Sequence, residues 1–180
     1  MYRKYLFYLL LIFFTSCIVK KKTSYSKTRT VTVEATPRDT ITVKEVTRKR
    51  FKNKKADAVI ASAMNYAGVR YRYGGETKKG MDCSGLIHVA LKENAIAFPR
   101  VSYVMAEEGK KIKVKDVRKG DLLFFKTLKK GKKINHVGLV VKVEKNEIKF
   151  IHATSSRGVI VSSLREGYWN HAFVKATRIL

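Results

Sequence analysis

The sequence predicts an α+β fold in which N-terminal helices pack on a C-terminal antiparallel β-sheet. Apolar residues with helical spacing come first, between residues 56 and 94, and short runs with β spacing follow after Gly120. Because helices and strands are segregated along the chain, their order favours antiparallel pairing over a parallel βαβ sheet. The composition agrees: 45% of the 180 residues are hydrophobic, enough for a packed core and too many for a disordered chain.

Two helices and five strands are predicted within residues 56–180. The first helix spans residues 56–66, and the second spans residues 84–94. The second helix places four apolar side chains on one face, namely Leu86, Ile87, Ala90 and Leu91. The strands are predicted at residues 122–126, 136–143, 148–152, 159–161 and 172–176. Lys145 and Asn146 form the predicted turn of a hairpin.

Residues 1–16 are typical of a signal peptide. A basic pair at residues 3–4 precedes an apolar run at residues 5–14, which is much shorter than the about 20 residues that cross a bilayer. Thr15 and Ser16 are small residues directly before Cys17. This ending resembles the bacterial lipobox, whose cysteine receives a diacylglycerol. We therefore expect a lipidated, membrane-anchored protein of the cell envelope; an ordinary signal peptide with a chance cysteine is the alternative.

Residues 17–55 are predicted to be a lipidated basic tether. Residues 18–55 carry 13 basic and three acidic side chains and almost no large apolar residues. Neither stretch of Thr-Val alternation, at residues 30–33 and 40–43, has an apolar face wide enough for a core, so we expect an extended, solvated segment. Lys20–Lys22 would add about 1 kcal/mol of attraction to anionic headgroups per basic side chain. The alternative is that these charges only keep a spacer soluble.

Cys83 is expected to carry chemistry. If Cys17 is acylated, Cys83 is the one thiol left and no intrachain disulfide can form. It is predicted in the first turn of the second helix with Asp82 as the N-cap, where unpaired N–H groups and the positive end of the helix dipole favour a thiolate. The Asp82 carboxylate opposes ionisation, so a cationic partner is needed. A buried, inert thiol is the alternative.

Two of the four histidines are candidates for that partner. His136 begins one predicted strand and His152 ends the next, so the two side chains would be adjacent on paired strands. Together with Cys83 they would supply a nucleophile, a general base and a group that orients the base. For each histidine, a hydrogen-bonded structural role is the alternative. His88 lies about 140° round the helix from Cys83, and His171 is expected to open a late strand without a chemical neighbour.

Six motifs occur in order across the predicted domain. They are Tyr71-Arg72-Tyr73-Gly74-Gly75, Asp82-Cys83-Ser84-Gly85-Leu86, Pro99-Arg100-Val101-Ser102, Gly120-Asp121-Leu122 with Phe124-Phe125, His136-Val137-Gly138, and Ile151-His152-Ala153. Together they resemble the NlpC-type papain-like cysteine peptidases of bacterial cell walls. The resemblance covers essentially all of residues 56–180, and it implies a papain-like α+β fold.

The resemblance also implies an activity. Its Cys-His-His triad maps onto Cys83, His136 and His152, and the family cleaves peptidoglycan stem peptides. The usual bond joins D-glutamate, through its γ-carboxyl group, to a diamino acid. This chemistry requires no metal and no cofactor, and we expect the protein to act as a monomer.

Three further residues match substrate-binding positions of the family. Tyr71 matches a tyrosine that borders the nucleophile and helps to bind the substrate or the oxyanion. Asp82 and Ser84 match positions that hold the free amine of a stem peptide in some members. The structural alternatives are a packed aromatic side chain, a helix cap and a residue of the first helical turn, respectively.

Rival functions stay open. One is a catalytically idle, wall-binding lipoprotein on the same fold, and another is an amidase or acyltransferase with the same triad. The net charge of +25 suggests nucleic-acid binding, but export would place the protein in the wrong compartment. Zinc binding by the cysteine and the two histidines has acceptable ligand types, although a cysteine at a helix start suits a nucleophile better.

Overall fold

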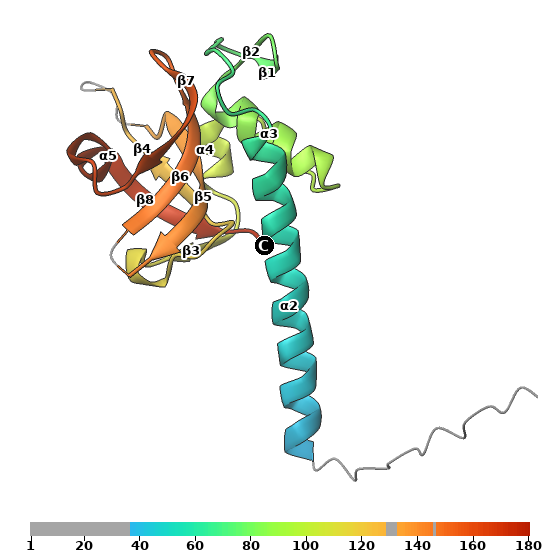
Figure 1. Ribbon diagram of the computed structural model, residues 1–180. Coiled ribbons are helices and arrows are strands. Elements are labelled where there is room, and N and C mark those ends of the chain that lie inside the picture. The colour runs from blue at the N-terminus through green and yellow to red at the C-terminus, as the bar shows by residue number, and fades with distance from the viewer. Residues whose placement is uncertain (1–36, 129–132, 146) are drawn as a thin grey trace, which may run out of the picture. The chain divides into compact units, whose positions relative to one another are not determined.

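The computed structural model describes residues 37–128, 133–145 and 147–180 (Figure 1). The predicted signal peptide, Cys17, Lys20–Lys22 and Asn146 lie outside these residues. The helices are α2 (Pro37–Met64), α3 (Cys83–Glu93), α4 (Ser102–Met105), the 3₁₀ turn η2 (Val114–Asp116) and α5 (Gly167–Ala172). The strands are β1 (Glu76–Thr77), β2 (Gly80–Met81), β3 (Lys110–Ile112), β4 (Leu122–Phe125), β5 (His136–Glu144), β6 (Glu147–Thr154), β7 (Gly158–Ser163) and β8 (Phe173–Arg178).

Helix α2 corrects the extended conformation expected for the second half of the tether. The helix starts at Pro37 and continues through residue 55 into the predicted helix without a break, ending at Met64. Proline is favoured at the first position of a helix because its missing N–H would have no helical partner there. The exposure expected for this segment does agree, because the side chains described before Ala56, such as Arg48 and Phe51, are exposed.

The six-stranded antiparallel sheet has the strand order β3-β8-β4-β5-β6-β7. All five predicted strands are present with shifted ends, so the α+β prediction is confirmed. Strand β3 and helix α5 were not predicted. His171 lies in α5 and does not open a strand, which corrects the expectation for that residue. The predicted hairpin pairs Glu144 with Glu147 across its turn.

Alternation along the strands builds a core on each face of the sheet. In β4, Leu122 and Phe124 pack with apolar residues of α2 and α3. Leu123 and Phe125 point to the opposite face and pack with Trp169 of α5. The sheet therefore separates the helices α2 and α3 from the short helix α5.

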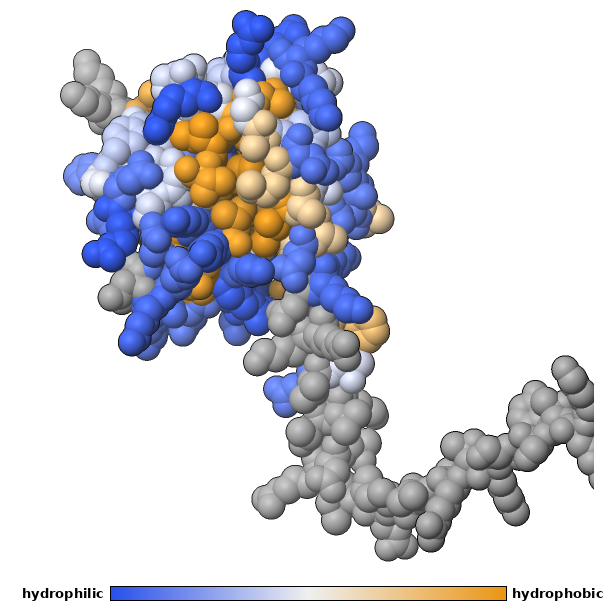
Figure 2. Space-filling model, in the orientation of Figure 1, coloured by the Kyte–Doolittle hydropathy of each residue, from blue (hydrophilic) through white to orange (hydrophobic). Residues whose placement is uncertain are grey.

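Hydrophilic side chains cover most of the face seen in Figure 2 and surround one apolar area. Among the described residues, no helix combines the length and the apolar character that a bilayer crossing requires.

An ion pair between a buried carboxylate and a partly exposed arginine fixes the last strand. Asp121 is 1% exposed and accepts hydrogen bonds from Arg178 Nε and Nη2, each at 2.8 Å. Removing one partner of a buried pair leaves an uncompensated charge. We expect Arg178→Ala to lower the free energy of unfolding by about 3 kcal/mol in urea titrations. Lys119→Ala, which removes an exposed pair with Asp57, is the control and should cost less than about 1 kcal/mol; equal losses would contradict this account.

Candidate active site

The site begins where strand β2 ends and helix α3 starts. Asp82 is the N-cap with an extended backbone, and its side chain accepts a hydrogen bond from the Gly85 N–H at 2.6 Å. Cys83 therefore lies in the first turn, as predicted, and α3 begins at Cys83, one residue before the predicted start of the helix. It lies beside the N–H groups at the helix start, where the helix dipole favours negative charge.

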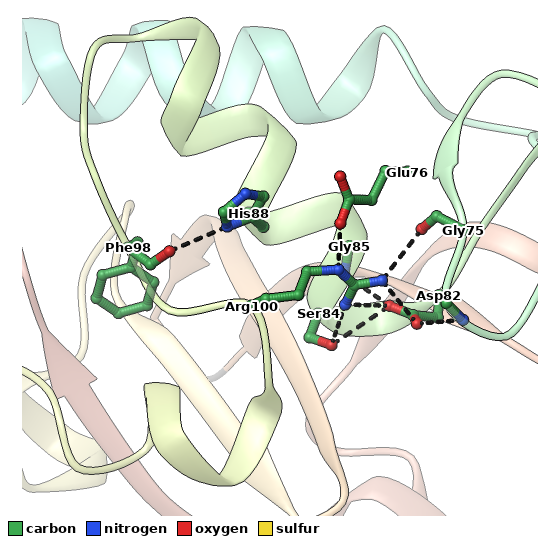
Figure 3. A network of polar contacts seen from close by, with 9 residues as sticks. Gly75, Glu76, Asp82, Ser84, Gly85, His88, Phe98 and Arg100 are labelled. Carbon is green, nitrogen blue, oxygen red and sulfur yellow. Dashed lines mark hydrogen bonds and ion pairs between the residues drawn. The ribbon is translucent and has the colours of Figure 1, made fainter.

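Arg100 holds the capping carboxylate from the other side (Figure 3). Its Nη1 and Nη2 donate to the two Asp82 oxygens at 3.0 and 2.9 Å. Nη1 also donates to Ser84 Oγ at 2.8 Å, and Nε pairs with Glu76. The Gly74 N–H donates to Asp82 Oδ2 at 2.7 Å. The protein itself therefore supplies donors to both oxygens of Asp82.

Gly85 is required by this close packing. A Cβ atom at this position would collide with the Gly75 carbonyl oxygen and crowd Arg100 and Asp82. The glycine thus allows the loop before β1 and the guanidinium to approach the start of α3.

The thiol of Cys83 faces the start of β5. Its Sγ lies 4.0 Å from the carbonyl oxygen of Asn135, and it receives a hydrogen bond from the Val137 backbone. These residues flank His136 in the sequence. The fold therefore brings the sulfur against the chain segment that carries the predicted base.

The two predicted histidines are joined directly. His136 Nε2 lies 2.9 Å from His152 Nδ1, and His152 Nε2 lies 2.9 Å from Ser162 Oγ. The strand pairing explains this row, because β5 pairs with β6 and β6 pairs with β7. Among the described residues, His136 Nδ1 has no hydrogen-bond partner, so this nitrogen is the one available to a thiol.

Trp169 encloses the imidazole pair. Its ring stacks on His136 with centroids 5.1 Å apart and an interplanar angle of 22°. The Trp169 ring packs edge-on against His152 with ring centroids 4.4 Å apart. The ring centroids of Phe150 and His152 are 4.7 Å apart. His136 is 8% exposed and His152 is fully buried. Aromatic packing therefore excludes water from most of both rings.

A cleft of about 490 Å³ opens beside the thiol. Cys83 and His136 line it together with Tyr71, and Trp169 forms part of its wall. Arg157, at the turn between β6 and β7, contributes a positive charge to the lining. The cysteine and the first histidine are thus both accessible from one cavity.

Burial keeps the reactive groups neutral. It raises the pKa of the Cys83 thiol; a hydrogen bond from the Val137 backbone offsets part of this effect, and the Asp82 charge adds to it. Burial lowers the pKa of His136 to about 4, which the Asp82 charge opposes. The pKa of His152 falls to about 2 through burial and the charges of His136 and Arg157. A neutral thiol and a neutral imidazole are therefore favoured at rest, in place of the ionised cysteine that the sequence suggested.

Burial and neighbouring charges also shift the pKa values of two groups beside the thiol. Burial raises the pKa of the Tyr71 hydroxyl, and the charges of Cys83 and Asp82 raise it further. Burial also acts to raise the pKa of Asp82, but the hydrogen bonds from Arg100 and Gly85 outweigh it and lower the pKa. Tyr71 thus keeps its proton and Asp82 stays charged.

The site does not have the geometry of a metal centre. In the part of the chain that the structure describes, no group of three or more His, Cys, Asp and Glu side chains is placed to hold an ion. The nitrogens of His136 and His152 that face each other are 2.9 Å apart, so they bond to one another and do not converge on a common point. This argues against the zinc alternative.

Three of the predicted site residues line the cleft, whereas His152, Asp82 and Ser84 do not. Tyr71, Cys83 and His136 line one cleft, and His152 lies behind His136. His88 bonds to the Phe98 carbonyl at 3.0 Å (Figure 3), away from the thiol as predicted.

Trp169 and Ser162 contact the histidines but were not among the predicted site residues. Trp169 is the single tryptophan of the chain, which was a usable signal. Ser162 lies just beyond the predicted end of its strand, so no signal pointed to it.

A cysteine at the first turn of a helix, next to histidines on an antiparallel sheet, defines a papain-like α+β domain. The NlpC/P60 family model matches residues 68–178, and the chain belongs to this family. The resemblance noted from the motifs is thereby confirmed.

Similar proteins agree with this assignment. The chain is 39% identical over 117 residues to the murein DD-endopeptidase MepS/murein LD-carboxypeptidase of Escherichia coli K12, covering 64% of this chain and 58% of that protein. It is 40% identical over 116 residues to the probable endopeptidase NlpC of the same strain, covering 64% and 72%. A crystal structure of an NlpC/P60 family protein from Bacillus cereus aligns with a TM-score of 0.62 at 28% identity, covering 68% of this chain and 39% of the other.

The buried histidines predict acid sensitivity. Both titrate near 6.5 when unfolded but stay neutral in the fold down to about pH 4 and about pH 2. The unfolded state therefore binds more protons below pH 6.5, and stability is lost as the pH falls. Each histidine should contribute a slope of about 1.4 kcal/mol per pH unit over its own window. Urea titrations between pH 7.5 and 4.5 measure this slope.

His152→Gln should reduce the slope by the contribution of one histidine. A stability that is constant from pH 6.5 to 4.5 in the native sequence would show that the two rings are not held neutral.

Proposed function

We propose that this protein is a cell-wall hydrolase that cleaves peptide bonds in peptidoglycan stem peptides. Cys83 is the nucleophile, His136 the general base and His152 the group that orients the base. The observation that carries the proposal is the single cleft shared by Cys83 and His136, with His152 bonded to the far nitrogen of His136. The murein endopeptidase activity in the name of the Escherichia coli relative supports the wall substrate.

The reaction starts from the neutral pair. His136 Nδ1 takes the thiol proton as Sγ attacks the scissile carbonyl carbon, so that a C–S bond forms and the carbonyl electrons move to oxygen. The tetrahedral intermediate then collapses, the C–N bond breaks, and His136 gives its proton to the leaving amine. A water molecule, deprotonated by His136, attacks the thioester. The C–S bond breaks, the acid product leaves, and His136 returns the proton to the departing sulfur, which restores the thiol and the neutral imidazole.

The oxyanion has candidate donors on two sides. The backbone N–H groups of Cys83 and Ser84 lie against the Cys83 sulfur, and Tyr71 lines the cleft with its hydroxyl proton retained. Donors fixed before the reaction stabilise the developing charge without reorganisation. Tyr71 therefore contributes to substrate or oxyanion binding in this proposal.

Asp82 and Ser84 are proposed to bind a substrate amine, but Arg100 already occupies the same side-chain oxygens. Both side chains already contact this guanidinium, and both are buried. A substrate amine would have to displace Arg100 or share Asp82 with it. Asp82 and Ser84 consequently also anchor the helix start, and substrate contact by them stays a prediction.

The location proposed is the bacterial cell envelope, with export by residues 1–16 and a lipid on Cys17. The basic segment that follows would hold the chain near anionic headgroups or wall polymers. We expect Cys17→Ser to move the protein from the membrane fraction to the soluble fraction and to abolish labelling by a radioactive fatty acid. Unchanged labelling would refute the anchor.

The central test is digestion of purified peptidoglycan by the full chain. The native protein should release stem-peptide fragments, and Cys83→Ala should reduce the rate at least about a thousandfold, because the covalent step is lost. The control is His171→Ala, because His171 is exposed and does not line the cleft. Its rate should be within about twofold of the native rate.

Mass spectrometry of the products separates the rival functions. Fragments ending at a stem-peptide bond support the endopeptidase, and their masses identify whether D-γ-glutamyl-diamino acid bonds are cut. Cleavage or transfer at another amide would favour the amidase or acyltransferase. No fragments from the native chain, with Cys83→Ala binding the wall equally well, would leave the idle wall-binding protein.

A further inference from the structure

Ser162 ends the row of hydrogen bonds that starts at His136. Its Oγ lies 2.9 Å from His152 Nε2, the residue is 4% exposed, and its side chain forms no other hydrogen bond among the described residues. His152 is fully buried and uses both ring nitrogens within the protein. The protonation of His152 is therefore decided by its two neighbours alone.

Proton counting limits how the three groups can be arranged. A neutral imidazole has one N–H donor and one acceptor nitrogen. If Ser162 accepts from His152 Nε2–H, then His152 Nδ1 is an acceptor, and His136 Nε2 must carry the proton between the rings. His136 Nδ1 is then a free lone pair. If Ser162 instead donates, every proton in the row shifts, and His136 carries its proton on Nδ1, where it cannot act as a base.

The arrangement also has to survive proton transfer. When His136 has taken the thiol proton, both of its nitrogens are donors, so His152 Nδ1 must accept. A neutral His152 then carries its own proton on Nε2, and among the described residues Ser162 Oγ is the one oxygen within hydrogen-bond distance of that nitrogen. Without this acceptor, the Nε2–H of His152 would be buried and unpaired while His136 is charged.

We propose that Ser162 is a positioning residue that accepts the Nε2–H of His152 and thereby selects the tautomer of His136 that can deprotonate Cys83. The inference rests on the proposed function, because it concerns the base of that reaction. Ser162 does not touch the substrate; it acts through His152 and His136. Trp169 and Phe150 hold the two rings in place, which leaves the hydrogen bonds to decide the tautomer.

The direct test is long-range ¹H–¹⁵N correlation NMR of the full native chain at neutral pH. Both His136 and His152 should carry their proton on Nε2, with Nδ1 unprotonated. A native His152 with its proton on Nδ1 would overturn the proposal, whether or not the protein is active. This measurement needs no variant and does not depend on whether the protein cleaves a substrate.

Variants link the tautomer to the reaction. Ser162→Ala should lower kcat for peptidoglycan cleavage about 10- to 100-fold with little change in KM, since the buried Nε2–H of His152 would have no acceptor once His136 has taken the thiol proton. The same variant should move the His152 proton to Nδ1. Ser162→Thr keeps the hydroxyl and should restore both the spectrum and most of the rate.

Ser163→Ala is the matched control. This neighbour on β7 uses its hydroxyl to accept from the Arg165 N–H at 3.2 Å and has no contact with the histidines. This variant should have the same histidine tautomers as the native protein, and its kcat should be within about twofold of the native value. A folded Ser162→Ala that is as active as Ser163→Ala would overturn the proposal. An inactive native chain that shows the expected tautomers would instead refute the hydrolase function and leave the hydrogen-bond row in place.

Discussion

Two imidazoles buried in one row of hydrogen bonds are the constraint on which this site depends. Removing His136 and His152 from water is costly unless their nitrogens are paired, and the pairing is supplied by three adjacent strands, β5, β6 and β7. The aromatic side chains of Trp169 and Phe150 make the burial nearly complete. The result is a base that is neutral at rest and held in one orientation.

The second half of the site is organised by charge. Asp82 must cap α3 next to the thiol, although its carboxylate opposes ionisation of Cys83. Arg100 binds both of its oxygens and offsets much of that charge locally. The same carboxylate favours a protonated His136. Asp82 therefore disfavours the thiolate and favours the imidazolium, so its two effects on proton transfer from the thiol to the imidazole oppose each other.

The sequence was sufficient for features that depend on local pattern. Helical spacing and strand alternation predicted α3 and the five strands from β4 to β8, and the position of Asp82 predicted the cap. The pairing of His136 with His152 followed from their places on neighbouring strands. The extended conformation predicted for residues 37–55 was wrong. It was inferred from the lack of an apolar face, but a helix can extend without one from a packed end, and α2 runs without a break from Pro37 to Met64.

Features that depend on tertiary contact could not be predicted. Ser162 bonds to His152 only because β7 pairs with β6 in one register. Helix α5 is six residues long, too short for a periodic signal, yet it places Trp169 on both imidazoles. The neutral resting state also depends on burial, which spacing along the chain does not reveal.

The most direct measurement of the central claim is the rate at which iodoacetamide alkylates Cys83. With Cys17 replaced by serine, Cys83 is the only thiol of the chain. If His136 removes the thiol proton during attack, the folded protein with its native His136 should react at least about tenfold faster at pH 7 than the His136→Gln variant. In urea, where the two groups are separated, both proteins should react alike. Equal rates in the folded state would contradict the coupling between the sulfur and the imidazole.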